Sequence, residues 1–333
     1  MENIVFHADG FGDAFVCFKA LYAIKELYPE YKLSFLTRGG GGIEPAFLEK
    51  IAFIDKIIIY QNDFFEKIQS ENPQIFISTQ RQGEYFKKLK RLNLPKCIVH
   101  AHFISISSKK LSTPFPFFRA KKHMSEIVLR LVRAIDTKHF DKNLKKIDFS
   151  RVKNLLPYDT KLSDEFFSKI DTKYEKIIGI NAFSNCSEGG GYNFFIKDWI
   201  NLGRRLALQY PNFLFLLLNF EKNPIQYKIE ENANLKVFVN NTSIASLLSI
   251  SKKLDFLISV DTGNVHICDI LQIPSLVLIS KIVAYRFSGG SYGSSCDKLV
   301  LKPTWQKEYK KIWEIFLHKA RRNLNLLFVK NKG

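Results

Sequence analysis

Short apolar runs of β type alternate with helical stretches along most of the chain, and this alternation limits the possible folds more than any other feature. In the first half, the strand-like runs cover residues 4–6, 33–36, 57–60, 75–78 and 97–100. A glycine-containing loop follows the first run, and a helical pattern then begins near Asp13 and stops at Pro29. Such alternation is typical of a parallel sheet that is covered by helices.

A second series of the same kind follows the polar, charge-rich segment 156–172. Its strand-like runs cover residues 177–180, 213–218, 237–239, 256–260 and 275–279, and its helical stretches cover 199–210, 244–253 and 263–271. A chain of 333 residues is also long for one hydrophobic core of roughly 100 to 200 residues. We therefore predict an α/β protein with two doubly wound, Rossmann-like domains over 1–160 and 173–303, and a terminal helix with a basic tail over 304–333.

The composition excludes several classes of protein. Apolar residues make up 46% and charged residues 25%, as in globular proteins and unlike disordered, collagen-like or disulfide-rich chains. The longest uninterrupted apolar run, 213–218, is far shorter than the roughly 20 residues that span a bilayer. The first residues lack the features of a signal peptide, and the five cysteines are scattered without zinc-finger spacing. We expect a cytoplasmic protein with reduced cysteines.

The net charge of +18 predicts an anionic partner, such as nucleic acid, anionic lipid head groups or phosphorylated sugars. Its distribution is uneven: residues 1–80 contain 7 Lys and Arg against 11 Asp and Glu, whereas residues 81–153 contain 19 against 5. Residues 302–333 add 9 against 2. The positive charge therefore concentrates in the second half of the first domain and in the terminal helix.

The first candidate site is the segment 9–13, which lies between the first strand and the first helix. A dinucleotide fingerprint would need a third glycine at position 15, where the chain has Phe15, so this form of NAD binding is disfavoured. Asp13 has two interpretations. It is either the N-cap of the helix or a general base at the carboxyl end of the sheet, where ligands bind in such folds.

The second candidate site is Asp261-Thr262-Gly263, again between a strand and a helix. Backbone N–H groups at Thr262 and Gly263 would meet a diphosphate at the positive end of that helix. Asp261 either caps the helix or binds sugar hydroxyl groups. His266, one turn further on, either donates to a phosphate or satisfies a neighbouring carbonyl group.

Together with Ala20-Leu21, Tyr28-Pro29 and Ile273-Pro274, these two motifs resemble those of glycosyltransferase family 9, the ADP-heptose:lipopolysaccharide heptosyltransferases. The resemblance implies a GT-B architecture, in which the first domain binds the acceptor, the second binds the nucleotide sugar and the terminal helix packs back on the first domain. It also implies an inverting, metal-independent transfer without a cofactor. Asp13 would be the base, and Asp261, Thr262 and Gly263 would hold the donor.

The loop after the first strand of the second domain is where this family places hydroxyl groups against the donor phosphates, so Ser184 and Ser187 are candidates. Any polar loop would look similar. Tyr192 stands where a phosphate-binding lysine is common in the family, Phe195 where proline is common, and Lys281 where a glycine-containing turn is usual. Lys281 either supplies the missing positive charge or is a solvated lysine.

On the acceptor side, the resemblance implies an anionic, lipid-linked core oligosaccharide and a peripheral position on the cytoplasmic face of the inner membrane. The basic segment 81–153, interleaved with aromatic residues, suits such a partner. Gly12, Lys121, Lys122 and Arg130 are the candidate acceptor contacts, and solvated helix faces are the alternative. A further glycine-rich run, 289–293, follows the last predicted strand of the second domain, and we interpret it as a loop that closes over the nucleotide.

Three other functions remain open. The first is a GT-B enzyme that transfers another nucleotide sugar to a bacterial surface glycan. The second is an inactive glycan-binding protein, against which the presence of both Asp13 and Asp261 argues. The third is a nucleic-acid-binding protein, which the charge permits but which no helix-turn-helix, zinc or RRM signature supports. We therefore expect a nucleotide-sugar partner and no nucleic acid.

Overall fold

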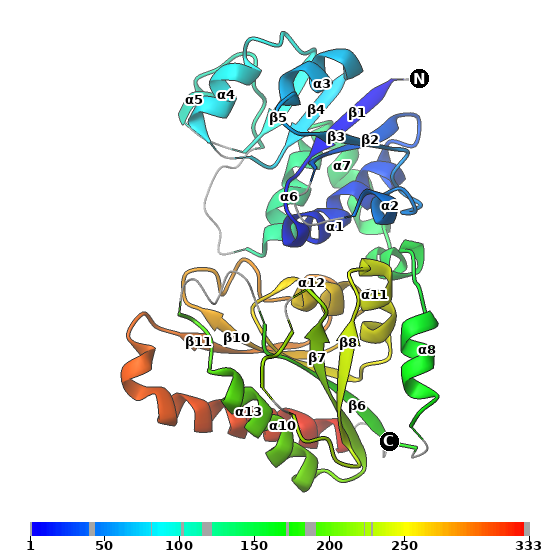
Figure 1. Ribbon diagram of the computed structural model, residues 1–333. Coiled ribbons are helices and arrows are strands. Elements are labelled where there is room, and N and C mark those ends of the chain that lie inside the picture. Colours follow the sequence, from blue (N-terminus) through cyan, green and yellow to red (C-terminus); the bar gives the residue numbers. More distant parts are fainter. Residues whose placement is uncertain are drawn as a thin grey trace. The chain divides into compact units, whose positions relative to one another are not determined.

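A computed structural model describes residues 2–39, 44–80, 82–100, 103–114, 122–170, 173–183, 191–222, 224–227 and 229–329. The chain forms two compact units, Met1–Pro157 and Tyr158–Gly333 (Figure 1). Each unit contains one parallel sheet with flanking helices, so the predicted α/β fold class is confirmed.

The first unit is built on five parallel strands in the order β3-β2-β1-β4-β5. The strands are β1 (Asn3–His7), β2 (Lys32–Arg38), β3 (Lys56–Tyr60), β4 (Ile75–Ser78) and β5 (Lys96–Val99). The central strand is almost completely buried, and its Val5 pairs with Ser34 on one side and Phe76 on the other. Burial on both faces explains why these strands are nearly continuous apolar runs.

Helices cover both faces of this first sheet (Figure 1). The helices are α1 (Phe11–Leu27), α2 (Pro45–Leu48), α3 (Phe64–Glu71), α4 (Gly83–Leu89), α5 (Phe103–Ile106), α6 (Met124–Arg133) and α7 (Thr137–Asn143), followed by the 3-10 segments η1 (Leu144–Lys146) and η2 (Phe149–Leu155). Side chains of α3 and α4 pack on one face in a single cluster with the strands. On the other face α1 packs against α6 and is buried along most of its length.

The second unit is built on six parallel strands in the order β11-β10-β9-β6-β7-β8. The strands are β6 (Lys176–Asn181), β7 (Phe213–Phe220), β8 (Leu235–Asn240), β9 (Phe256–Val260), β10 (Ser275–Ser280) and β11 (Cys296–Leu301). The flanking segments are α8 (Lys161–Phe167), α10 (Ile196–Gln209), α11 (Ile244–Lys252), α12 (Gly263–Ile270), η3 (Trp305–Glu308) and α13 (Tyr309–Val329). The sequence prediction contained every strand of this sheet except β11.

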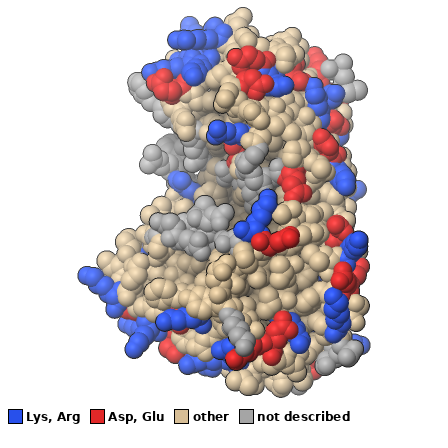
Figure 2. All heavy atoms as spheres, viewed as in Figure 1, with Lys and Arg blue, Asp and Glu red and all other residues tan. Residues whose placement is uncertain are grey.

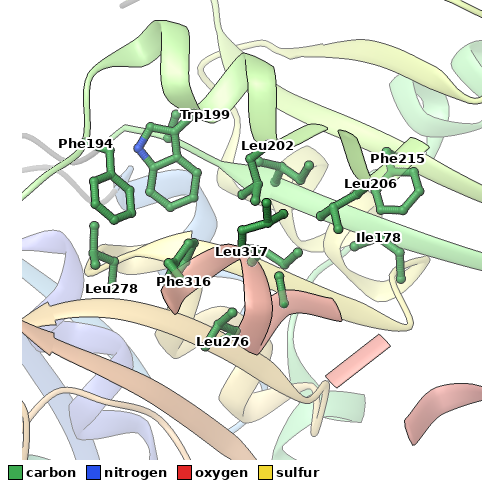
Figure 3. Packing of buried hydrophobic residues seen from close by; sticks show 14 of the residues in the cluster. Ile178, Phe194, Trp199, Leu202, Leu206, Phe215, Leu276, Leu278, Phe316 and Leu317 are labelled. Atoms are coloured by element: carbon green, nitrogen blue, oxygen red, sulfur yellow. The ribbon is translucent and has the colours of Figure 1, made fainter. Parts of the chain in front are cut away.

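The terminal helix α13 packs on the second unit, so the predicted packing on the first domain is wrong. Its buried side chains, Trp313, Phe316, Leu317, Ala320 and Leu324, belong to the cluster that also contains Trp199 of α10 and Leu276 and Leu278 of β10 (Figure 3). These residues recur at intervals of three and four, which makes an apolar stripe. A stripe of this kind shows that a helix is covered on one side, but it does not specify which sheet covers it.

Polar contacts also hold α13 on the second unit. Asp297 of β11 accepts hydrogen bonds from Lys319 at 2.8 Å, from Arg322 at 2.7 Å and from Asn323 at 2.9 Å. Burial alone would raise the pKa of Asp297, but hydrogen bonds from Lys319, Asn323 and the Lys298 backbone N–H lower it overall. Among the residues that the structure describes, no helix combines the length and the apolar character that a bilayer span requires.

Candidate active site

Four neighbouring strands of the first sheet end in polar residues at its carboxyl edge, and Asp9 connects them. The Asp9 carboxylate accepts a hydrogen bond from the Tyr60 hydroxyl group at 2.6 Å, from the Arg38 backbone N–H at 3.0 Å and from the Gln80 side-chain amide at 3.1 Å. Burial would raise the pKa of Asp9, but hydrogen bonds from His7, Tyr60 and Arg38 more than offset this effect and lower it. The Asp9 side chain is therefore ionised, and its oxygen atoms accept hydrogen bonds from several donors.

His7 lies directly behind Asp9 and is only 1% exposed. Its Nε2 atom is 3.3 Å from the Asp9 carboxylate, and its Nδ1 atom is 3.0 Å from both the Ser78 and the Tyr85 hydroxyl oxygens. The three residue types are those of a serine–histidine–aspartate triad, but the ring nitrogens are exchanged, since Nδ1 faces the serine and Nε2 the aspartate. Ser78, however, has no exposed surface, and its hydroxyl group also hydrogen-bonds with Tyr85 at 2.9 Å. A substrate carbonyl group cannot reach this serine, so the network is structural.

The first helix, α1, begins at Phe11, directly after Asp9 and Gly10. The N-cap of α1 is Gly10, with φ 88° and ψ 152°, a conformation that is essentially restricted to glycine. Gly12 and Asp13 are the second and third residues of the helix, so the interpretation of Asp13 as its N-cap is wrong. The side chain of Asp13 lies outside the described part of the structure. Its backbone position places the residue in the first turn, at the positive end of a 17-residue helix.

The second motif, Asp261-Thr262-Gly263, lies between a strand and a helix of the second unit, as Gly12-Asp13 does in the first. Asp261 follows β9, its backbone N–H donates to Leu278 of β10 at 2.9 Å, and α12 begins two residues later. The N-cap of α12 is Thr262 rather than Asp261, and the Thr262 side chain caps none of the N–H groups that the structure describes. Burial raises the pKa of Asp261 to about 6. A largely buried carboxyl group and a helix N-terminus therefore lie side by side at this edge.

Two buried polar side chains occupy the first turns of α12. His266 is 6% exposed, and its ring lies edge-on to the Phe287 ring with the centroids 6.0 Å apart. Asn264 is 4% exposed, and its Nδ2 atom has no hydrogen-bond partner within the described residues. Sequence reasoning did not select Asn264. The only signal for it would have been its polar side chain within an otherwise apolar helical stretch.

Lys281 follows β10, the strand next to β9, and its side chain is exposed. Its backbone N–H donates to Leu301 of β11 at 2.9 Å. Lys281 therefore lies at the same edge of the sheet as Asp261. The structure records no ion pair of Lys281 with any described carboxylate.

Hydrogen bonds hold the described residues on either side of the loop that follows β6. The Asn193 side-chain amide donates to the Ala182 carbonyl group at 2.8 Å, and the Trp199 indole N–H donates to the Asn193 side-chain oxygen at 2.9 Å. The Trp305 indole N–H donates to the Gly191 carbonyl group at 2.8 Å. These contacts bring the residues after the loop back to the end of β6. Ser184 and Ser187, the predicted phosphate contacts, lie outside the described residues.

Two of the acceptor-side candidates, Lys122 and Arg130, lie just before and on α6, which runs along α1, whereas Gly12 lies in the first turn of α1. Lys19 of α1 forms an ion pair with Glu126 of α6, and its ammonium group also lies 4.9 Å from the centroid of the Phe149 ring. Lys122 is exposed just before α6, and Arg130 lies one turn beyond Glu126 and is partly buried. Lys121 lies outside the described residues. In the view of Figure 2, Lys and Arg side chains gather over α4 and along α13.

The glycine-rich run 289–293 lies at the other edge of the second sheet. It precedes β11, and the backbone N–H of Ser275, the first residue of β10, donates to Ser295 at 3.0 Å. The Gln272 side chain, beyond the end of α12, donates to Tyr292 at 3.1 Å. The interpretation of this run as a loop that closes over a nucleotide is therefore wrong, because it lies at the amino ends of the strands.

A cavity of about 470 Å³ also lies away from both motifs. Its lining includes Glu2, Gln74 and Lys96, which lie where β1, β4 and β5 begin. This cavity therefore opens at the amino edge of the first sheet. The described residues contain no group of three or more His, Cys, Asp or Glu side chains that could hold a metal ion.

Comparison with known proteins identifies the class of fold. No protein-family model matches the chain, and no curated protein matches it at a significant level of sequence similarity. Solved structures do match, and they show that the chain, with its two parallel α/β units, has a GT-B fold.

The similar structures include a glycosyl transferase of family 9 and heptosyltransferases. A glycosyl transferase of family 9 from Veillonella parvula covers 98% of this chain and 97% of its own, with a TM-score of 0.69 and 15% identity. The E. coli ADP-heptose lipopolysaccharide heptosyltransferase II covers 96% and 100%, with a TM-score of 0.62 and 10% identity. The E. coli heptosyltransferase WaaC, solved with ADP, covers 94% and 100%, with a TM-score of 0.59 and 14% identity. The resemblance predicted from the motifs is thus confirmed as a similarity of fold.

Proposed function

We propose that this protein is a family 9 glycosyltransferase that moves heptose from ADP-heptose to the core of a lipopolysaccharide or lipooligosaccharide. One observation carries the proposal: within a family 9 fold, both motifs stand where a strand of a parallel sheet ends and a helix begins. Gly12-Asp13 opens α1 after β1, and Asp261-Thr262-Gly263 opens α12 after β9. Ligands of doubly wound sheets bind at these strand ends.

In the proposed reaction, an acceptor hydroxyl oxygen attacks the anomeric carbon of the donor sugar. The bond from that carbon to the diphosphate oxygen breaks, and Asp13 takes the hydroxyl proton. Attack from the face opposite the leaving group inverts the anomeric configuration. The leaving diphosphate gains negative charge, which the N–H groups at the start of α12 and the ammonium group of Lys281 stabilise. The resemblance to family 9 supports a metal-independent reaction.

The donor contacts follow from the same placement. Asp261, Thr262 and Gly263 contact the sugar and the diphosphate, and His266 donates from one turn further along α12. Ser184 and Ser187 contribute hydroxyl groups from the loop after β6. Tyr192 replaces the lysine that is common in the family, so Lys281 is the cation that we assign to the phosphates.

On the acceptor side, we propose that Gly12, Lys121, Lys122 and Arg130 contact an anionic, lipid-linked core oligosaccharide. The excess of Lys and Arg in residues 81–153 supports a peripheral position on an anionic inner-membrane surface, where each such residue near the surface contributes about 1 kcal/mol. Cosedimentation with vesicles tests this. Binding to vesicles with phosphatidylglycerol, and no binding to vesicles of phosphatidylcholine alone, is the expected result.

A second candidate function is the transfer of a different nucleotide sugar on the same fold. The departures at Tyr192, Phe195 and Lys281 favour it, because all three positions lie in the unit that binds the donor. The mechanism and the role of Asp13 would be the same.

Thermal unfolding of the purified protein with ADP, UDP, GDP, NAD or a short RNA separates these functions. A ligand at about 100 times its Kd adds about 2.7 kcal/mol to the free energy of unfolding, which raises the Tm by a few degrees. A shift with ADP alone is expected. A turnover assay with ADP-heptose and a core acceptor, with NMR analysis of the product's anomeric configuration, then tests inversion. A shift with UDP or GDP supports the second candidate, and a shift with RNA alone contradicts both.

A further inference from the structure

The Asp9 carboxylate connects three segments that follow different strands of the first sheet. Arg38 is the last residue of β2, Tyr60 is the last residue of β3, and Gln80 lies two residues beyond β4. All three donate to Asp9, at 3.0, 2.6 and 3.1 Å. Each donor comes from the end of a different strand, so hydrogen bonds from several directions fix the position of the Asp9 side chain.

His7, which lies behind Asp9, is closely packed against its neighbours. The His7 ring centroid lies 4.6 Å from that of Phe64 and 5.7 Å from that of Tyr60, and both of its nitrogen atoms have hydrogen-bond partners. Its neighbours Ser78 and Phe76 have no exposed surface. A buried and fully paired histidine has no alternative position available without loss of hydrogen bonds or contacts.

Only Gly10 separates this network from the first helix. Asp13 follows Asp9 by four residues, and the first hydrogen bond of α1 joins the Ala14 N–H to the Gly10 carbonyl group at 3.2 Å. A shift of Asp9 therefore moves the first turn of α1 directly. Asp9 itself is a poor base, because its pKa is lowered and its oxygens accept several hydrogen bonds.

We infer that Tyr60, Gln80 and His7 act through Asp9 as positioning residues for Asp13: they hold the first turn of α1 in the place that proton transfer from an acceptor requires. This inference rests on the proposed function, in which Asp13 is the base. Displacement of a catalytic group by about 1 Å can reduce a rate by about 100-fold. The network would thus affect turnover without contact with the substrate.

The test uses Tyr60→Phe in the full-length protein, which removes only the hydroxyl group that donates to Asp9. We expect kcat to fall about tenfold or more, while the KM for the donor and the affinity for ADP stay within twofold. Tyr28→Phe is the matched control, because the Tyr28 hydroxyl group donates to the Asp136 carbonyl group at the opposite edge of the same sheet. It should leave kcat unchanged.

Hydrogen exchange supplies a readout that does not depend on activity. The Ala14 amide should exchange about tenfold faster in Tyr60→Phe than in the wild type or in Tyr28→Phe. Gln80→Leu, at a partly exposed position, is the second variant and should give the same two effects if Tyr60→Phe does not fold. Unchanged kcat and unchanged Ala14 exchange in a folded variant would overturn the inference. Faster Ala14 exchange in Tyr60→Phe, together with a wild-type protein that carries out no glycosyl transfer, would instead refute the proposed function alone.

Discussion

The carboxylate of Asp269, near the end of α12, accepts a hydrogen bond from the Ser291 hydroxyl group at 2.5 Å. The same carboxylate accepts the backbone N–H groups of Gly290 at 2.8 Å, Ser291 at 3.0 Å and Tyr292 at 3.2 Å, and the Ser294 hydroxyl group at 3.0 Å. Asp269 is only 3% exposed. One buried side chain therefore holds the loop before β11 against α12.

Asp269→Ala should strongly destabilise the second unit, because it removes the acceptor of one buried donor, the Tyr292 N–H, and of several partly buried donors. We expect the free energy of unfolding to fall by about 3 kcal/mol in urea denaturation followed by circular dichroism. Glu165→Ala is the control, since Glu165 forms an exposed ion pair with Lys169 that contributes at most about 1 kcal/mol. Equal effects of the two substitutions would show that the Asp269 contacts add little.

Asp13→Ala should reduce glycosyl transfer by about 100-fold to 10,000-fold, the range that a general base contributes. ADP affinity, measured by calorimetry, should stay within twofold because the donor binds to the other unit in our proposal. Glu66→Ala removes an exposed carboxyl group from the first turn of α3 and should leave transfer unchanged. Activity of Asp13→Ala within a few-fold of wild type would exclude Asp13 as the base.

Asp261 should make stability depend on pH between about 4 and 6. Burial raises its pKa from an ordinary value of 3.8 to about 6, so the folded state binds this proton more tightly than the unfolded state does. Deprotonation on going from pH 4 to pH 6 therefore lowers the free energy of unfolding, and the loss persists at higher pH. Asp261→Asn should recover about 1 to 3 kcal/mol at pH 7 to 8.

Calorimetric unfolding of wild type and Asp261→Asn across this pH range measures the effect. The exposed Asp164→Asn in α8 should retain the wild-type pH profile. Parallel pH profiles of wild type and Asp261→Asn would mean that Asp261 does not titrate in this range. The same substitution should also weaken donor use, which turnover at several donor concentrations would detect.

Removal of divalent metals should leave transfer unchanged, because the proposed reaction relies on the N-terminus of α12 and on Lys281 to stabilise the leaving diphosphate. Turnover after dialysis against EDTA, compared with turnover in added Mg²⁺ or Mn²⁺, measures this. Restoration of a lost activity by either ion would contradict the proposed metal independence.

Much of the fold was predictable because its signals are local. The strands of a parallel sheet are buried on both faces and appear as short apolar runs, and the helices between them carry their own periodicity. The two motifs were detectable for a similar reason. Each lies within a few residues of a strand end, so the order of elements alone places Gly12-Asp13 and Asp261-Thr262-Gly263 at carboxyl edges.

Contacts between distant parts of the chain were not predictable in this way. The donors to Asp9 come from positions 38, 60 and 80, and nothing in the sequence near Asp9 selects them. The apolar stripe of α13 identified a covered helix but not its partner, which is the second sheet. The run 289–293 looked like a flexible loop over a ligand until the contacts of Asp269 placed it at the other edge.

The sequence by itself determined two parallel α/β units with the same order of strand, motif and helix in each, because burial and periodicity act over a few neighbouring residues. The tertiary structure alone decided how those pieces are held: that Gly10 caps α1, that Asp9 joins the ends of neighbouring strands, and that α13 covers the second sheet. These features depend on residues far apart in the chain, and only the folded arrangement of the strands brings their side chains within hydrogen-bond or packing distance.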